Sequence, residues 1–433
     1  MVSLASFGFR VPDKARPVVR VSPDQVDVSD PAGARQIHRI KGEYLKGPFY
    51  EKIVKGPNVF NTRDVELHRR YRKLLSGPMS ETGLQVLLPQ VEAKIRLTIQ
   101  RASEEMYTRG AADLYKWWMF MTTDVIGELS FGESFRMLEY GQKNQYILDL
   151  ESAGKTLFLR TSFPFIRYIS GYVNLPVISA AFEASKRAGT YARQSLQRHR
   201  DLVSNDPDNV KPTLFSHMYK AEDKQALSME EIVGNARSYI IAGSDTTSNS
   251  LTYLVWAVCR HPEIKKQLLE ELSTLPEDFT DGDVKALPYL KRVIDETLRL
   301  YSAAPGALPR VVPEGGASFG KHWLPGGTVV STQAYSLHRD PVAFPDAEKF
   351  DPTRWENPTQ AMKEAYMPFG GGSRSCIGIH LAYMEMRLAA ARFFRAFPNA
   401  TMSNLEGMSD EDMVQRLSFL MSPRGGRCLI QAS

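Results

Sequence analysis

The sequence predicts a mainly α-helical protein with a smaller β portion, and two patterns carry this prediction. From about residue 64 to residue 275, Leu, Ile, Met and Ala recur at spacings of three and four, the period of an amphipathic helix. Between residues 303 and 335 the chain changes to Pro, Gly and β-branched residues, the composition of strands and turns. No internal repeat, low-complexity tract or Gly/Ser linker divides the chain, so a single domain over residues 1–433 is expected.

The individual elements can be placed by their own signals. Two short strands are expected within residues 18–29, because β-branched and polar residues alternate there around a Ser-Pro-Asp turn. The clearest helix starts at Ser228, where Ser-Met-Glu-Glu has the form of a capping box, and runs to about Cys259. Its length and apolar character favour a path through the middle of the protein. Other helices are expected at 86–108, at 115–130, from Pro262 and at 287–301.

Composition and charge exclude several classes of protein. With 43% hydrophobic and 24% charged residues, the chain can bury a large core. The net charge of +5 is small for 433 residues and no nucleic-acid-binding module is recognisable, so no nucleic-acid partner is expected. The cysteines Cys259, Cys376 and Cys428 are far apart, which argues against a disulfide framework or a zinc cluster and favours an intracellular setting. Charged residues and Pro12 interrupt the N-terminus, which predicts neither a signal peptide nor a membrane span.

One cysteine lies in a glycine-rich segment, Met367-Pro-Phe-Gly-Gly-Gly-Ser-Arg-Ser-Cys376. The three glycines allow the backbone to approach a flat ligand and to direct amide N–H groups toward the sulfur. Helix-forming residues follow from Ile377 to Ala390, so Cys376 is expected to open a helix whose positive end favours the thiolate. A thiolate is an iron ligand. The alternative, for a cysteine considered alone, is a buried structural residue beside a glycine turn.

The same segment resembles the haem-binding signature of the cytochrome P-450 family. The resemblance implies that family's fold, with a haem b (iron protoporphyrin IX) between the long central helix and the helix after the cysteine loop. It further implies that Cys376 ligates the iron, that Arg374 pairs with a haem propionate and that Phe369 covers the sulfur. The positions that match the signature are Phe369, Gly370, Gly372, Arg374, Cys376 and Gly378.

Two further segments are similar to the family's buried ion-pair cluster. Glu296 and Arg299 lie three apart on one face of a predicted helix and can pair, although such a pair alone is most often a surface contact of little worth. The segment Phe350-Asp-Pro-Thr-Arg-Trp355 resembles the family segment whose arginine, here Arg354, joins them. The resemblance implies a triad that locks the geometry of the haem pocket and takes no part in the chemistry.

In the long helix, residues 241–248 are small and polar where a core helix would carry Leu. Considered alone, the segment fits equally well a close helix contact at Gly243, with Asp245 and Thr246 bonding back to carbonyl groups. It also resembles the oxygen-activation segment of the family. The resemblance implies two catalytic residues: Thr246 would steady the activated oxygen, and Asp245 would relay protons from water.

Cationic residues match the family positions that reach the haem propionates. His68 and Arg72 are four apart on one side of a basic helix start, and Arg310 follows the loop 303–309. Buried propionates need such partners, whereas a solvated charged face is the interpretation for the neighbouring basic residues. The residues expected to line a substrate pocket, from their positions relative to these motifs, are Tyr239, Ala242, Ala304, Ala307, Leu308 and Phe419.

A different enzyme class is indicated by Gly316-Ala-Ser-Phe-Gly320, which has the G-x-S-x-G form of a serine hydrolase with Ser318 as nucleophile. That motif needs a strand, a sharp turn and a helix, whereas Pro325 and a β-branched run follow here. The aromatic segment 157–183 is expected to be core, with a substrate-entry lid or a shallow membrane contact as the alternatives.

The resemblance covers nearly the whole chain and looks most like fungal members, often found in secondary metabolism. It implies a haem-thiolate monooxygenase that activates O₂ and oxidises an apolar small molecule with electrons from an NADPH-dependent cytochrome P-450 reductase. The alternative within the family is a haem-thiolate isomerase, dehydratase or peroxygenase. Such fungal members usually carry an N-terminal membrane anchor, and this sequence starts just after it. The resemblance implies a location at the endoplasmic reticulum surface, or a soluble or peripheral protein if the chain is complete. Contact with the membrane without an anchor is an open alternative, and a monomer is expected.

Overall fold

The computed structural model describes residues 17–53, 56–155, 176–206, 209–216, 227–417 and 420–432. They belong to two compact units. The first unit is drawn from Met1–Gly47, Ile95–Met119 and Asp245–Ser433, and the second from Pro48–Lys94 and Phe120–Ser244. In this described part of the chain, every helix is too short or too polar to span a bilayer. Phe419 and most of the aromatic segment 157–183 lie outside the described residues.

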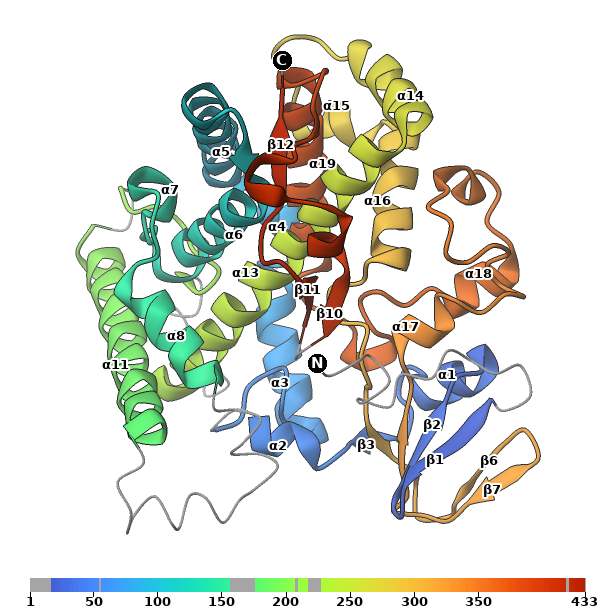
Figure 1. Cartoon of the computed structure of the whole chain (residues 1–433). Coiled ribbons are helices and arrows are strands. Elements are labelled where there is room, and N and C mark those ends of the chain that lie inside the picture. Colours follow the sequence, from blue (N-terminus) through green and yellow to red (C-terminus); the bar gives the residue numbers. More distant parts are fainter. Residues whose placement is uncertain are drawn as a thin grey trace. The chain divides into compact units, whose positions relative to one another are not determined.

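A five-stranded sheet with the order β1-β2-β8-β5-β3 belongs to the first unit (Figure 1). β2 and β8 run parallel, and the other neighbouring strands run antiparallel. Val28 and Val330 pack into a core with Phe319. The strands are β1 (Val18–Ser22), β2 (Gln25–Val28), β3 (Leu45–Lys46), β5 (Arg310–Val311) and β8 (Val329–Ser331), and helix α1 (Pro31–Ile37) lies beside the sheet. Strands therefore form where β-branched residues predicted them.

Shorter β elements complete the first unit. A hairpin joins β6 (Ala317–Phe319) to β7 (His322–Leu324), and another joins β10 (Gln415–Leu417) to β11 (Met421–Pro423). The third group is a three-stranded sheet, in which β12 (Leu429–Gln431) lies between β4 (Ala112–Asp113) and β9 (Thr401–Met402). Short 3₁₀ turns are η2 (Pro352–Trp355), η3 (Gly372–Arg374), η4 (Leu405–Gly407) and η5 (Asp410–Met413).

Helices α14, α16 and α19 pack on one another in the first unit (Figure 1). α16 buries a face that includes Val293 and Leu298, because its apolar residues recur at three and four spacing. The helices of this unit are α14 (Pro262–Ser273), α15 (Asp281–Lys285), α16 (Pro288–Leu300), α17 (Ala334–Leu337), α18 (Gln360–Ala365) and α19 (Ile379–Ala396). The last of these follows the cysteine segment.

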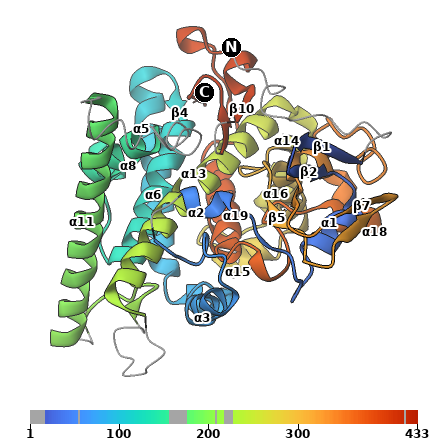
Figure 2. The same ribbon diagram turned by 90° about the horizontal axis from the view of Figure 1, so that it is seen from below.

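The second unit consists mainly of helices, and α8 and α11 lie side by side in it (Figures 1 and 2). Phe135 and Tyr146 stack there with ring centroids 5.2 Å apart, and Tyr191 of α11 lies 4.7 Å from Tyr146. The helices described wholly within it are α2 (Phe49–Ile53), α3 (Val65–Ser76), α4 (Glu81–Gln85), α7 (Met137–Tyr140), α8 (Gln145–Lys155) and α11 (Pro176–Asn205).

Among the described helices, three have residues in both units: α5 (Leu88–Arg109), α6 (Leu114–Phe131) and α13 (Met229–Arg260). α13 is the predicted long helix, and its capping box is present. The backbone N–H of Ser228 donates to Glu231 Oε2 at 2.8 Å, and the N–H of Glu231 donates to Ser228 Oγ at 3.3 Å. Both bonds satisfy amide groups that the first turn of a helix leaves without partners.

Candidate haem site

The cysteine segment forms a tight loop between α18 and α19. The backbone N–H of Cys376 donates to the carbonyl of Phe369 at 2.9 Å, which closes the loop. Gly370 and Gly372 have φ angles of +69° and +62°, a region that favours glycine. A Cβ atom on Gly372 would lie 1.8 Å from the carbonyl oxygen of His38, so no larger residue fits there. These two glycines therefore allow the backbone conformation that the loop requires.

Cys376 is exposed, whereas Cys259 is half-buried and Cys428 is buried. Burial raises the pKa of the Cys259 thiol to about 12 and that of Cys428 well above its usual value, which disfavours a thiolate at either. Cys376 is therefore the cysteine best suited to a metal. Helix α19 begins at Ile379 after the cap residue Gly378, so the prediction that the helix starts at Ile377 was wrong. Glycine φ values and the 3₁₀ turn η3 delay the helix, and Cys376 lies in the preceding turn.

One further predicted residue of the first unit lies beside this loop, and another lies within it. Leu308 packs against a buried cluster that includes Met367, and a Cβ on Gly370 would be 3.7 Å from the Leu308 Cδ1 atom. The rings of Phe369 and Tyr383 are 5.5 Å apart. Phe369 is thus held at the loop by a ring contact on α19, while its cover of the sulfur stays a prediction.

A buried cationic region belongs to the same unit. Arg310 is 4% exposed, and its Nη1 atom donates to the carbonyl of Pro309 at 2.9 Å. Lys46 is also 4% exposed. Burial, followed by repulsion from Arg310 and Arg374, lowers the pKa of Lys46 to about 6. The field in this region is therefore positive and suits an anionic group. Lys46 was not predicted as a site residue from the sequence, because the signal that identifies it is its strand register with Arg310.

Glu296 of α16 is the centre of a buried ion-pair cluster. Arg299 Nε and Nη2 donate to its two carboxylate oxygens at 2.9 and 2.8 Å, and Arg354 Nε donates to Oε1 at 3.0 Å. The side chains of Glu296 and Arg299 are 0% exposed and that of Arg354 is 10% exposed. The structure thus brings together the three residues that the sequence predicts as a triad.

Additional hydrogen bonds satisfy the Glu296 cluster. Trp355 Nε1 and the backbone N–H of Asp351 each donate to the Glu296 carboxylate at 2.9 Å. Arg299 Nη1 donates to the carbonyls of His338 and Ala347 at 2.8 and 2.7 Å. Burying charges is tolerable only when each is paired and hydrogen-bonded in this way. The cluster therefore fixes the loop from 338 to 355 against α16.

His338 connects this cluster to the cysteine segment. Its Nδ1 atom lies 2.8 Å from the carbonyl of Arg299, and its Nε2 atom accepts from the backbone N–H of Met367 at 2.9 Å. Acceptance at Nε2 requires the proton on Nδ1, so the ring is neutral. Complete burial lowers its pKa to about 3, in agreement with this tautomer. The first residue of the cysteine segment is thereby tied to α16.

Residues 241–248 lie in an unbroken stretch of α13. A Cβ on Gly243 would lie 2.9 Å from Ile126 Cγ1, so Gly243 makes the close helix contact that one interpretation of the segment required. Asp245 and Ala242 are exposed and Thr246 is half-buried, although most of the remaining helix is buried. The two catalytic candidates thus lie side by side on an accessible part of the helix.

The comparisons with known proteins agree with this geometry. A family model described as Cytochrome P450 matches residues 16–429. The chain belongs to the cytochrome P450 family. Membership implies a haem held by a cysteine thiolate. The residues of this P450 fit that group, because an accessible thiol and a buried cationic region lie in the same unit.

Named relatives of this P450 are fungal. It is 51% identical to cytochrome P450 monooxygenase tazI of Aspergillus terreus, with 96% of this chain and 86% of the relative covered. It is 42% identical to cytochrome P450 monooxygenase azaI of Aspergillus niger, with 96% and 94% covered. The predicted enzyme class, a cytochrome P450 monooxygenase, and the predicted likeness to fungal members are confirmed.

A solved structure supports the fold class. The crystal structure of the cytochrome P450DA heme domain superposes with a TM-score of 0.83 at 19% identity, over 99% of this chain and 93% of that chain. The predicted mainly α-helical P450 fold is confirmed.

The hydrolase motif does not form a nucleophile elbow in this P450. Ser318 lies in β6 and pairs with Trp323 of β7 in an antiparallel hairpin that turns at Gly320. A nucleophile elbow needs a helix after the turn, and a strand follows instead. The serine hydrolase alternative was therefore wrong.

His68 and Arg72 lie on α3 of the second unit, where His68 is 7% exposed and Arg72 is half-buried. Among the predicted pocket residues, Tyr239 is buried and its ring lies 5.6 Å from that of Phe215. Ala304 and Ala307 are exposed in the first unit. Tyr239 is therefore packed in the protein core.

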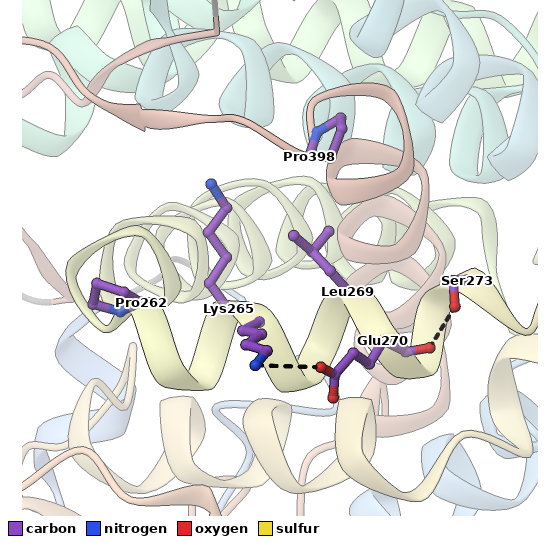
Figure 3. Close-up of a pocket in the computed structure, with 7 residues that line it drawn as sticks. Pro262, Lys265, Leu269, Glu270, Ser273 and Pro398 are labelled. Atoms are coloured by element: carbon purple, nitrogen blue, oxygen red, sulfur yellow. Dashed lines mark hydrogen bonds and ion pairs between the residues drawn. The ribbon is translucent and has the colours of Figure 1, made fainter.

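A surface pocket of about 530 Å³ lies between α14 and the turn after α19 (Figure 3). Pro262, Leu269 and Pro398 form its apolar part, and Lys265 donates to the carbonyl of Ala400 at 2.6 Å. None of the predicted site residues lines it. We therefore assign it no part in the chemistry.

Proposed function

We propose that Cys376 is the thiolate ligand of a haem b and that this monooxygenase oxidises an apolar small molecule. The observation that carries the proposal is the accessible Cys376 thiol at the end of a loop closed by its own amide, with Arg310 and Arg374 in the same unit. When bound, the haem supplies oxygen activation, which a thiolate ligand promotes by donating electron density.

The protein's own residues have separate tasks in this proposal. Arg374, Arg310, His68 and Arg72 bind the propionates, and Phe369 and Gly378 shape the surroundings of the sulfur. A Cβ on Gly378 would lie 3.9 Å from Cys376 Sγ, so this residue borders the ligand atom. Glu296, Arg299 and Arg354 hold the loop geometry.

Asp245 and Thr246 deliver protons. The exposed Asp245 carboxylate exchanges protons with water, and the Thr246 hydroxyl steadies the oxygen that receives them. Ala242, Ala304, Ala307 and Leu308 line the substrate side.

The wider setting follows from the family. Electrons come from NADPH through a separate cytochrome P450 reductase, which docks on a basic face near Cys376. The substrate belongs to fungal secondary metabolism, as the likeness to fungal relatives supports. The chain acts as a monomer, as one domain over residues 1–433, at the surface of the endoplasmic reticulum.

The iron ligand is tested by adding carbon monoxide to the reduced protein. The wild type should give the absorption maximum typical of thiolate ligation. Cys376→Ser should lose this maximum, and Cys259→Ser, at a half-buried cysteine, should keep it. A spectrum typical of histidine ligation in the wild type, or an unchanged spectrum in Cys376→Ser, would reject the assignment.

The reaction class is tested by turnover. Product that depends on NADPH and reductase supports oxygen insertion. Product with peroxide alone, or rearrangement without any reductant, identifies a peroxygenase, isomerase or dehydratase.

The proton-delivery role is tested separately. Thr246→Ala should keep haem and release much of its reducing equivalents as peroxide. Ser250→Ala, whose hydroxyl only bonds back to the carbonyl of Thr246 at 3.0 Å, should remain coupled. Equal release of peroxide by the two variants would contradict the role of Thr246 in proton delivery.

A further inference from the structure

Two phenol groups share one buried carboxylate in the first unit. Tyr383 Oη of α19 donates to Asp295 Oδ1 of α16 at 2.8 Å, and Tyr366 Oη donates to the same oxygen at 3.3 Å. The other oxygen of Asp295 pairs with Lys291, and the Asp295 side chain is 8% exposed. The carboxylate therefore has a cation that balances its charge and two phenol protons within hydrogen-bond distance.

The same tyrosines belong to a series of aromatic rings that starts in the cysteine segment. The ring of Phe369 lies 5.5 Å from that of Tyr383. Tyr383 and Tyr366 meet at Asp295, and the ring of Tyr366 lies 4.6 Å from that of Trp355. Trp355 is half-buried, so this end of the series reaches solvent. The rings therefore connect the loop of the proposed iron ligand to the protein surface.

The contact between Tyr383 and Asp295 suits the loss of an electron from the phenol. Tyrosine and tryptophan are the aromatic side chains that give up an electron most readily. Removal of an electron makes a phenol strongly acidic, so the electron leaves easily when a base takes the proton at the same time. Asp295 is placed to be that base. Burial, followed by the charge of Asp295, raises the pKa of the Tyr383 phenol well above its usual value, so the phenol keeps its proton until the electron leaves.

We propose that Tyr383, Tyr366 and Trp355 form a relay that returns electrons to the haem after peroxide has oxidised it in the absence of substrate. This inference rests on the proposed function, because the haem bound by Cys376 is the group that becomes oxidised. An oxidised haem that receives no electrons damages its own porphyrin, so the relay protects the enzyme. The Phe369 ring is not oxidised and supplies the contact between the loop and Tyr383.

The electrons and protons of the relay balance. Hydrogen peroxide takes two electrons from the haem and two protons from solvent, and leaves as two molecules of water. Tyr383 returns one electron to the haem, and its phenol proton passes to Asp295 Oδ1. Tyr366 then reduces the Tyr383 radical, which takes the proton back from Asp295 while Tyr366 passes its own proton there. Trp355 reduces Tyr366, whose proton returns in the same way, and ascorbate in solution reduces Trp355. A second passage returns the second electron.

The relay is tested by electron paramagnetic resonance of the full-length holoenzyme, frozen after it is mixed with hydrogen peroxide without substrate. The wild type should show a tyrosyl radical, identified by the narrower hyperfine pattern that ring-deuterated tyrosine gives. Tyr383→Phe keeps the ring, removes the hydroxyl and should lose most of this signal. Asp295→Asn keeps a hydrogen-bond acceptor but provides no base, so it should lose the signal as well.

Tyr253→Phe is the matched control. Tyr253 is also buried in the first unit, and its ring stacks on that of Tyr301 at 4.8 Å. Its hydroxyl has no hydrogen-bond partner among the residues that the structure describes. Without a base to take its proton, Tyr253 should not be oxidised, and Tyr253→Phe should keep the wild-type signal. Each variant must first give the carbon monoxide spectrum of the wild type, which shows that a lost radical is not lost haem.

A second readout follows the protection itself. Peroxide should bleach the haem of Tyr383→Phe faster than that of the wild type. Ascorbate should slow the bleaching in the wild type and in Tyr253→Phe, but not in Tyr383→Phe. Trp355→Phe should prolong the tyrosyl radical in the presence of ascorbate, because its last ring cannot be oxidised.

The outcomes separate the relay from the proposed function. An unchanged radical in Tyr383→Phe, an equal loss in Tyr253→Phe, or a haem-loaded wild type that forms no tyrosyl radical would overturn the relay while the haem-thiolate assignment stands. A wild type that takes up no haem rejects the proposed function, and the relay with it.

Discussion

Two regions of the first unit bury charged side chains, and they do so in opposite ways. Around Glu296, the carboxylate accepts hydrogen bonds from Arg299, Arg354, Trp355 and the backbone of Asp351, so two of its partners are cations. Between β3 and β5, Lys46 instead faces Arg310, and burial together with repulsion from this cation lowers the pKa of Lys46 to about 6. A cluster whose positive and negative charges pair within the chain needs no ligand and is structural. A buried basic group that faces a cation instead loses its proton more easily, so the sign balance decides which buried group keeps its charge.

Glu385 is a third kind of buried ionisable group, one that stays protonated. It lies in α19, is 2% exposed, and burial raises its pKa to about 8 despite a hydrogen bond with Thr247. The group remains protonated at neutral pH, because desolvation disfavours the carboxylate more than one hydrogen bond favours it. The same unit therefore contains a paired acid, a neutral acid and a basic residue, Lys46, whose pKa is lowered to about 6.

The largest effect is expected in the balanced cluster. Glu296→Gln removes the negative charge that Arg299 and Arg354 share, and should lower the free energy of unfolding by about 3–5 kcal/mol in urea denaturation. Glu66→Gln is the matched control, because the Glu66 carboxylate pairs with Arg69 three residues on at 2.8 Å, and both side chains are at least 70% exposed. Its cost should be below about 1 kcal/mol. Similar costs for the two variants would contradict the distinction between buried and exposed pairs.

A pH-dependent effect of roughly 2–4 kcal/mol is expected at Glu385. Below its usual pKa of 4.5 the carboxyl is protonated in both folded and unfolded chains. Between 4.5 and about 8 only the unfolded chain releases the proton, so the stability that this group contributes falls as the pH rises. Glu385→Gln should therefore be more stable than wild type at pH 8 and similar near pH 4.5. Glu277→Gln, at an exposed site, should leave the pH profile of unfolding unchanged.

Alanine substitutions at two glycines of the cysteine loop should lower the free energy of unfolding by different amounts. Gly372→Ala places a Cβ 1.8 Å from the His38 carbonyl as well as at φ +62°, and should cost roughly 2–3 kcal/mol. Gly370→Ala has only the strain of φ +69°, since its nearest neighbour is 3.7 Å away, and should cost about 1 kcal/mol. Thermal unfolding measures both. Equal costs would mean that the loop can move away from His38.

The smallest effect is expected outside both charged regions. Ser318→Ala, on the exposed side of the β6–β7 hairpin, should change stability by less than about 0.5 kcal/mol and leave turnover unchanged. A loss of activity in this variant would reopen the hydrolase interpretation.

Local sequence patterns predicted the elements well. The capping box at Ser228, the helix at 288–300 and the strands at 18–28 lie where periodicity and cap residues placed them, because these signals act within a few residues. The start of α19 was misplaced, since Ile377 favours helix by composition but follows a 3₁₀ turn and two left-handed glycines. Local backbone conformation, rather than helix propensity, decided that boundary.

The helical class, the cysteine loop and the residues of the Glu296 cluster could all be predicted from the amino-acid sequence, because periodicity and short motifs of fixed residue types encode them. Which charged groups face each other depends on the folded chain. Lys46 and Arg310 are separated by more than half of the chain, and the register of β3 with β5 opposes them. A buried charge derives its role from its neighbours in space, and those neighbours are chosen by strand pairing and packing.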